Sequence, residues 1–276
     1  MGEVIVITSG KGGVGKTTTT ANIGAALAAD GKSVVLLDAD IGLRNLDVVM
    51  GLENRIVFDL VDVIEHKCKL RQALIKDKRF DGLYLLAASQ TKDKNDVTPE
   101  QMKKLCSEMA ENFDYILIDC PAGIEQGFYN AIAGADRALI VTTPEVSAVR
   151  DADKIIGRLE AGEIEKKHLV INKVRMDMVK KSEMLSIEDV IEILAIDLIG
   201  VVPDDENIIV STNKGEPAVS DIKSRAGQAY RNTAKRIMGE QVPLMDLQDD
   251  GSFLYKLKKI FSKDGTNGGM SGVRAG

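Results

Sequence analysis

Tryptophan is absent from this sequence, and cysteine and aromatic residues are scarce. The three cysteines, Cys68, Cys106 and Cys120, are odd in number and form no CxxC pair. A disulfide scaffold and a cysteine-based zinc site are therefore both disfavoured. An excess of basic residues is missing as well, because 36 Lys and Arg stand against 42 Asp and Glu and give a formal net charge of −6. Broad binding to nucleic acid needs a basic surface, so we expect no direct nucleic-acid partner.

Long apolar stretches are also missing. No run approaches the roughly 20 residues that cross a bilayer, and the first apolar stretch, residues 4–7, is too short for a signal peptide. Hydrophobic residues make up 44% and charged residues 28% of the 276-residue chain. These are ordinary values for a globular protein, so the pattern predicts a soluble, cytoplasmic protein with a packed core.

Short apolar runs alternate along the chain with longer stretches of helical periodicity. The runs are apolar throughout and rich in β-branched residues, as in strands that are buried on both faces; they span residues 4–7, 34–37, 83–86, 115–118, 138–141, 169–171 and 198–202. Helical periodicity marks residues 17–29, 99–112, 146–159 and 187–194. This alternation predicts an α/β fold, with a mostly parallel sheet of seven strands or more that is flanked by helices.

The composition changes after Gly239. We expect one domain over residues 1–239, and then a linker over residues 240–251 with Pro243 and an acidic cluster. Residues 252–263 are basic and apolar, whereas residues 264–276 are rich in glycine and predicted to be disordered.

A phosphate-binding loop is the clearest motif of the chain. The sequence GKGGVGKT fits GxxxxGK[ST] and lies between a predicted strand and a predicted helix. Glycines let successive backbone N–H groups point at phosphate oxygens. Lys16 would neutralise the β- and γ-phosphates, and the Thr17 hydroxyl would bind Mg²⁺. The candidate nucleotide-binding residues here are Gly10, Lys11, Gly12, Gly13, Val14, Gly15, Lys16, Thr17 and Thr18.

Acidic residues follow two of the predicted strands. Asp119 ends the apolar run 115–118, which is the Walker B arrangement that holds Mg²⁺ directly or through water. Asp38 and Asp40 follow the run 34–37 and would face the ligand crevice at the carboxyl edge of the sheet. The alternative is that these two carboxylates merely cap the turn. Gly123 lies where a backbone N–H could meet the γ-phosphate and act as a switch.

Lys11 directly follows the first glycine of the loop, where most phosphate loops carry no lysine. In this respect the motif resembles the deviant Walker A motif of the ParA/MinD superfamily. The resemblance implies that Lys11 reaches the nucleotide of a partner subunit, that Asp40 positions the attacking water, and that Asp38 supports Mg²⁺ or its water shell.

The superfamily also suggests how the base is recognised. By the same resemblance, Asn172 and the loop with Pro203 and Asp205 contact adenine, which favours ATP as the nucleotide. All three residues follow predicted strands, so the alternative is that they are ordinary polar residues at strand ends.

The block 252–263 has the pattern of an amphipathic interfacial helix. Its apolar residues share one helical face; they are Phe253, Leu254, Leu257, Ile260 and Phe261. Four lysines add at most about 4 kcal/mol of attraction to an anionic leaflet, and ordering the helix costs much of that gain. One copy should bind membranes weakly, and two linked copies about 10²–10⁴-fold more tightly. Docking on the chain's own surface or in a groove of another protein are the alternatives.

Further stretches narrow the resemblance to the MinD family, the septum-site-determining ATPases of bacterial division; they are residues 41–53, 74–79, 88–97, 121–127, 142–157 and 215–222. The resemblance implies an ATPase that dimerises on Mg·ATP, docks on the inner face of the cell membrane and recruits the division inhibitor MinC, which blocks FtsZ assembly away from midcell. MinE or another topological adaptor would act on the dimer, and Asp151 would couple the nucleotide state to partner contact.

Three other functions remain open at this point. A ParA-like DNA-partitioning ATPase would need a basic surface and no amphipathic segment. A MinD-like regulator of flagellar number would share both the phosphate loop and the membrane segment. An iron–sulfur scaffold of the same superfamily would need cysteine pairs that are absent here.

Overall fold

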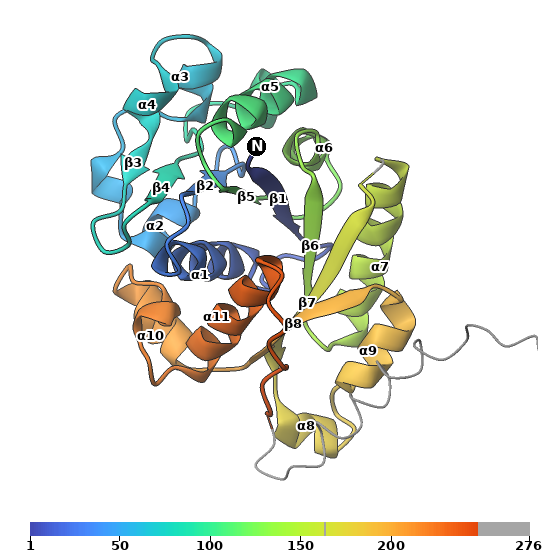
Figure 1. Ribbon diagram of the computed structural model, residues 1–276. Coiled ribbons are helices and arrows are strands. Elements are labelled where there is room, and N and C mark those ends of the chain that lie inside the picture. The colour runs from blue at the N-terminus through green and yellow to red at the C-terminus, as the bar shows by residue number, and fades with distance from the viewer. Residues whose placement is uncertain (163, 248–276) are drawn as a thin grey trace, which may run out of the picture.

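A mixed eight-stranded sheet forms the centre of the computed structural model, which describes residues 1–162 and 164–247. The strand order is β3-β4-β2-β5-β1-β6-β7-β8 (Figure 1). The strands are β1 (Glu3–Thr8), β2 (Val34–Asp38), β3 (Ile75–Lys76), β4 (Leu83–Leu86), β5 (Tyr115–Asp119), β6 (Arg137–Thr142), β7 (Lys166–Val174) and β8 (Asp197–Pro203). Neighbouring strands run parallel, except that β3 pairs antiparallel with β4 at one edge.

Helices cover both faces of the sheet (Figure 1). They are α1 (Lys16–Ala29), α2 (Leu46–Met50), α3 (Leu60–Ile64), α4 (Leu70–Ala73), α5 (Pro99–Ala110), α6 (Gln126–Ile132), α7 (Val146–Ala161), α8 (Met176–Lys180), α9 (Ile187–Leu194), α10 (Asn207–Asn213) and α11 (Arg225–Ile237). Short 3₁₀ turns span Glu53–Arg55, Lys94–Asp96 and Ala218–Ser220.

Alternate residues of each strand enter two separate cores. Val4 and Val6 of β1 pack with α3, α5, α6, α7 and α9, whereas Ile5 and Ile7 pack with α1, α2 and α11. Burial on both faces explains why the strands are apolar throughout. Because the strands next to β1 run parallel to it, their carboxyl ends meet at one edge, where the predicted site residues follow.

The predicted fold class is confirmed. All seven predicted runs are strands, and the four stretches of helical periodicity correspond to α1, α5, α7 and α9. β3 is the strand that the sequence did not predict. Among the described residues, no helix is both long enough and apolar enough to span a bilayer.

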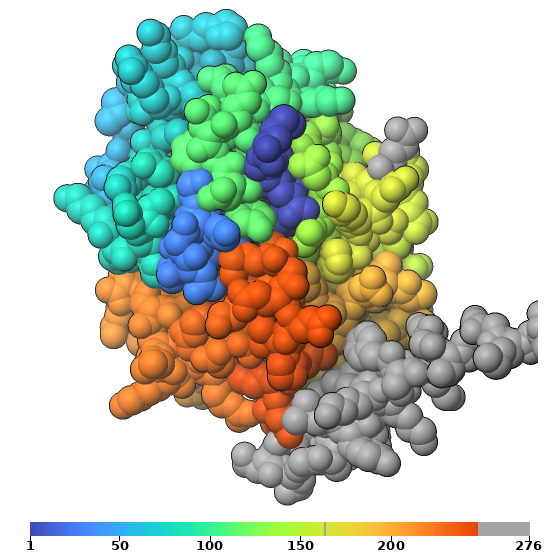
Figure 2. Space-filling view, viewed as in Figure 1, coloured from blue at the N-terminus to red at the C-terminus, as the bar shows by residue number. Residues whose placement is uncertain are grey.

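Residues 240–247, the first part of the predicted linker, lie against the domain after α11 (orange-red in Figure 2). Arg236 donates hydrogen bonds to the carbonyl oxygens of Val242 and Pro243, and the side chain of Leu247 is buried. The predicted amphipathic helix at 252–263 and the tail at 264–276 lie outside the described residues.

Candidate nucleotide site

The turn between β1 and α1 forms an open cradle at the carboxyl edge of the sheet. Gly13 and Gly15 have φ angles of 78° and 97°, in the left-handed region that favours glycine. A Cβ atom at Gly12 or Gly13 would meet no atom within 4 Å, so both positions border open space. α1 begins at Lys16, and the N-terminus of a helix attracts anions through its free N–H groups and its dipole. This geometry suits a phosphate group.

The ammonium group of Lys16 lies inside this loop. The side chain is buried, and Nζ donates a hydrogen bond of 2.9 Å to Oγ of Ser9. Ser9 in turn donates to the carbonyl oxygen of Lys11 at 2.8 Å. No carboxylate in the described part of the chain forms an ion pair with Lys16. A buried charge is costly unless it is compensated, so this ammonium group fits an anionic ligand.

Asp119 provides a buried carboxylate next to the loop. The Thr20 hydroxyl donates a hydrogen bond of 3.3 Å to it, and the Thr17 hydroxyl also contacts it. Burial raises the pKa of Asp119, and the nearby charge of Asp38 raises it further. A hydroxyl and a carboxylate are hard oxygen ligands of the kind that Mg²⁺ prefers. Thr17 and Asp119 therefore fit the predicted magnesium site.

Asp38 caps a turn, and the magnesium support that the resemblance implies for it stays a prediction. Its Oδ1 accepts a hydrogen bond from the backbone N–H of Asp40, and its Oδ2 accepts from those of Asn45 and Leu46. Burial raises its pKa, although these three donors oppose the rise. Asp38 thus caps the turn that carries Asp40, which agrees with the structural alternative stated above, and a metal would compete with these donors for its oxygens.

Asp40 lies half-buried on that turn. Burial raises the pKa of its carboxyl group, whereas Lys16 and Lys94 lower it. The charge of Lys16 therefore reaches Asp40, which places the predicted water-positioning residue on the same side of the site as the phosphate loop.

A cavity of about 780 Å³ joins the phosphate loop to the ends of β7 and β8. The predicted site residues that line it are Gly13, Gly15, Lys16, Thr17, Thr18, Asn172, Pro203 and Asp205. Tyr230 and residues of α10, Ile209 among them, also line the cavity. Such a volume lies within the range of about 300–1,000 Å³ that is common for ligand pockets, so the structure brings the predicted phosphate and base contacts into one space.

Asn172 supports the phosphate loop as well as lining the cavity. Its Nδ2 donates a hydrogen bond of 2.8 Å to the carbonyl oxygen of Val14, and the next residue, Lys173, donates one of 2.7 Å to that of Gly13. A Cβ atom on Gly15 would lie 2.3 Å from Nδ2 of Asn172. The end of β7 therefore holds the left-handed glycines in place.

The carboxylate of Asp205 is occupied within the fold. It accepts hydrogen bonds from the backbone N–H groups of Asn207 and Ala226 and from the Ser224 hydroxyl. Burial alone would raise the pKa of Asp205, but these donors lower it below its ordinary value. Asp205 thus anchors the loop after β8 to the start of α11, and its contact with a base stays a prediction.

Lys11 and Gly10 contact α7 instead of the cavity. Nζ of Lys11 lies 3.1 Å from Oε2 of Glu145 and 3.1 Å from the Ser147 hydroxyl. A Cβ atom on Gly10 would lie 2.2 Å from the carbonyl oxygen of Asp151. The predicted switch residue thus packs on the phosphate loop through its backbone, while its carboxylate pairs with Lys154.

Gly123 lies on the turn between β5 and α6. Its φ angle is 90°, and a Cβ atom there would meet nothing within 4 Å. The space around Gly123 is open, and its contact with a γ-phosphate stays a prediction.

Several contacts of the site escape sequence reasoning. Ser9 directly precedes Gly10, and Lys173 directly follows Asn172. The only sequence signal for these two residues was their position next to a predicted site residue. Glu145 lies in the stretch 142–157 that carries the resemblance, and α10 begins just after Asp205, but their contacts with the site depend on tertiary packing.

Comparison with known proteins places this chain in a family. A family model described as the CobQ/CobB/MinD/ParA nucleotide binding domain matches residues 5–218. The septum site-determining protein MinD of Bacillus subtilis is 59% identical over 264 residues, which cover 95% of this chain and 98% of that protein. The chain belongs to the MinD family.

Solved MinD structures agree with this assignment. The MinD chain in the MinC:MinD complex of Aquifex aeolicus has a TM-score of 0.81 at 51% identity, with 88% of this chain and 99% of that chain covered. MinD of Pyrococcus horikoshii in complex with Mg-ADP has a TM-score of 0.78 at 28% identity, with 88% and 100% covered. The resemblance drawn from the motifs is thereby confirmed.

MinD-family membership assigns this chain to the nucleotide-binding ATPases of septum-site determination. It favours this function over DNA partitioning and flagellar regulation. ParA-like neighbours, such as the ParA family ATPase of Chlorobium tepidum at 20% identity and a TM-score of 0.70, share the fold.

Proposed function

We propose that this chain is a Mg·ATP-dependent ATPase that places the division site by switching between a cytoplasmic monomer and a membrane-bound dimer. The observation that carries the proposal is the buried side chain of Lys16, which forms no ion pair in the described residues and lines the cavity of about 780 Å³. The complex of the Pyrococcus horikoshii relative with Mg-ADP supports the choice of ligand.

The residues of the site divide the chemistry among them. The loop N–H groups and Lys16 would bind the β- and γ-phosphates, and Thr17 and Asp119 would hold Mg²⁺. The ion would supply positive charge to the phosphate oxygens. Asp40 would orient the attacking water, and Asp38 would keep Asp40 in place through the hydrogen bond from its backbone N–H.

Lys11 would act only in the dimer. Its ammonium group pairs with Glu145 and Ser147 of its own chain. This pair is exposed, so it contributes little to stability and exchanges at low cost. We propose that ATP-dependent dimerisation moves Lys11 onto the partner's nucleotide, where its charge would stabilise the transferring phosphoryl group.

Membrane docking and partner binding complete the proposal. In the dimer, two copies of residues 252–263 would bind anionic lipids of the inner membrane together. The dimer would recruit MinC, which would block FtsZ assembly away from midcell. The MinC:MinD complex of Aquifex aeolicus supports MinC as the partner. MinE or another adaptor would stimulate hydrolysis, which would return the monomers to the cytoplasm.

Two variants separate dimerisation from hydrolysis. Lys11→Ala should keep ATP binding but elute as a monomer in size-exclusion chromatography with Mg·ATP. Asp40→Ala should bind ATP and elute as a dimer, yet release phosphate at least about 100-fold more slowly. An ATP-dependent dimer of Lys11→Ala, or normal turnover by Asp40→Ala, would refute the corresponding role.

A further inference from the structure

A second cavity, of about 900 Å³, lies outside the nucleotide site. It is lined by α5 and the turn after it, from Gln101 to Phe113, and by the end of α3, the turn after α3 and α4. These helices lie at the same end of the molecule, beside β4 (Figure 1). None of the residues that line this α5 groove belongs to the phosphate loop or to the cavity next to it.

The floor of the α5 groove is apolar. Its side chains are buried or half-buried and mostly aliphatic; they are Val63, Ile64, Leu70, Leu74, Leu105 and Phe113. They belong to the core cluster on this face of the sheet, or pack against it. An apolar floor of this size favours a ligand with a hydrocarbon part.

The rim of the α5 groove is basic, although the chain as a whole has a net charge of −6. Lys67, Lys69, Arg71 and Lys104 are exposed along it, and Glu108 is the acidic residue among the lining residues. The apolar groups thus lie on the floor of the α5 groove, and the charged groups lie at its rim, or mouth.

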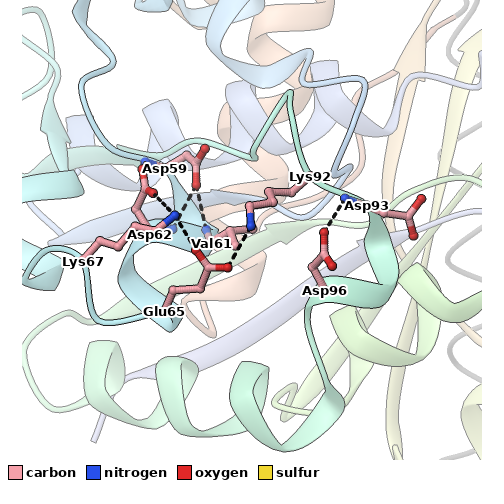
Figure 3. A network of polar contacts seen from close by, with 8 residues as sticks. All are labelled: Asp59, Val61, Asp62, Glu65, Lys67, Lys92, Asp93 and Asp96. Carbon is pink, nitrogen blue, oxygen red and sulfur yellow. Dashed lines mark hydrogen bonds and ion pairs between the residues drawn. The ribbon is translucent and has the colours of Figure 1, made fainter.

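One of these cations is already neutralised within the chain. Nζ of Lys67 lies 3.4 Å from Oδ1 of Asp62 and 2.5 Å from Oε2 of Glu65, and Glu65 also pairs with Lys92 at 2.8 Å (Figure 3). Within residues 1–162 and 164–247, no carboxylate forms an ion pair with Lys69, Arg71 or Lys104. Three cations at the mouth therefore remain for an anionic group.

We propose that the α5 groove binds a single-chain amphiphile with an anionic head, of the fatty-acid class. The hydrocarbon chain lies on the apolar floor, and the carboxylate meets Lys69, Arg71 and Lys104 at the mouth. Residues 252–263 of the chain itself carry four lysines and no acidic residue, so the charge of the rim disfavours them as the occupant.

The reactivity of the Cys68 thiol can report whether a ligand occupies the α5 groove. Cys68 lines the α5 groove and is half-buried, whereas Cys106 and Cys120 are each 1% exposed. Burial raises the pKa of both buried thiols to about 12, so neither reacts readily with a maleimide. The rate at which N-ethylmaleimide modifies Cys68 therefore reports whether the groove is filled.

The experiment measures this rate by mass spectrometry on the full-length protein, with dodecanoate below its micelle concentration. We expect dodecanoate to slow the modification of Cys68 at least fivefold. Dodecyltrimethylammonium, which has the same chain and a cationic head, should slow it less than twofold. Equal protection by both compounds, or none by dodecanoate, would overturn the proposal.

A pair of neighbouring lysines provides the matched control. Lys104 lines the α5 groove, whereas Lys103 is exposed on the same helix outside it. Each variant is compared with its own unliganded rate. Lys104→Glu should lose the protection by dodecanoate, and Lys103→Glu should keep it. Protection that survives in Lys104→Glu would contradict an anionic head at this rim.

An acidic peptide is the competing occupant. A helical peptide with a leucine face and flanking glutamates is tested in parallel. Protection by this peptide and none by dodecanoate would overturn the lipid proposal in favour of a protein partner.

Discussion

Lys16 stands out at the residue scale because it is a buried cation that forms no ion pair in the described chain, although its charge acts on the nearby carboxyl groups of Asp40 and Asp119. Among the described residues, the side chain of Lys16 forms a hydrogen bond with the Ser9 hydroxyl. A neutral hydroxyl compensates a buried charge poorly, whereas phosphate oxygens would form strong charge-assisted hydrogen bonds with it. We therefore expect Lys16 to contribute more to nucleotide binding than to the stability of the empty protein.

Replacing Lys16 tests this assignment. Lys16→Ala should weaken ATP binding by about 3 kcal/mol, or about a hundredfold, while the midpoint of thermal unfolding without nucleotide changes little. Binding of a fluorescent ATP analogue measures the first effect and calorimetry the second. Lys154→Ala, which removes an exposed lysine from α7, is the control and should bind normally. Unchanged affinity in Lys16→Ala would remove this residue from the site.

Asp119 makes the empty protein sensitive to pH. In the unfolded chain its carboxyl group titrates near 3.8, and in the folded protein burial and Asp38 raise its pKa. The folded state therefore binds a proton that the unfolded state has lost, and stability falls as the pH rises from about 4 through the raised pKa.

Asp119→Asn should flatten this dependence. Without nucleotide and Mg²⁺, the variant should unfold at a higher temperature than the parent at pH 8, and the two should differ less at pH 5. A gain of about 1 kcal/mol corresponds to about 2–4 °C. Asp38 acts in the same direction, so part of the slope should remain. Identical slopes for the two proteins would show that Asp119 is ionised when folded.

The motifs predicted which residues lie together at the site, but they did not predict the contacts that each residue makes. The loop, Asn172 and the end of β8 line one cavity, as the sequence suggested. The capping role of Asp38 and the anchoring role of Asp205 depend on backbone N–H groups up to 21 positions away. No pattern of residue types carries that information.

At the scale of elements, two glycines join the end of α2 to the end of α10. Gly51 and Gly215 have φ angles of 61° and 65°. A Cβ atom on Gly215 would lie 2.5 Å from Cα of Gly51. Arg79 fixes the same contact, because it donates hydrogen bonds to the carbonyl oxygens of Gly215 and Met50 and pairs with Asp77. The turn after Asp40 and the helix that lines the nucleotide cavity are thus held together.

Gly215→Ala should break this contact. The left-handed backbone alone costs a non-glycine residue about 1–2 kcal/mol, and the clash with the Gly51 backbone adds to it. Gly239→Ala is the control, because its φ angle is 90° and its Cβ atom would meet nothing within 4 Å. Urea unfolding should therefore show a larger loss for Gly215→Ala than for Gly239→Ala. Equal losses would mean that the helices can separate freely.

Two of the elements that the sequence failed to predict, β3 and α11, have weak hydrophobic signals. β3 has two residues at the sheet edge. In α11 most of the buried residues are small; they include Ala226, Gly227, Ala229 and Ala234. Small side chains let this helix approach β8 closely, where a Cβ atom on Gly200 would lie 2.6 Å from Oγ1 of Thr233. Helices and strands are predicted from the spacing of large apolar residues, so an element that packs through small residues is not predicted in this way.

At the scale of the whole molecule, the proposal couples the phosphate loop to a membrane segment at the other end of the sequence. Nothing within one chain need transmit a signal between them. If ATP joins two chains, two weak membrane segments become linked, and their combined affinity rises by about 10²–10⁴-fold. The nucleotide would then control membrane binding through dimerisation alone.

Co-sedimentation with anionic liposomes tests this coupling most directly. The protein is mixed with the liposomes in Mg·ATP, in Mg·ADP and without nucleotide, together with Phe261→Glu and the control Asn267→Glu, which adds the same charge to the tail. We expect the parent and Asn267→Glu to sediment only with ATP, and Phe261→Glu to stay in solution. Binding without nucleotide, or no binding at all, would contradict a membrane switch driven by ATP.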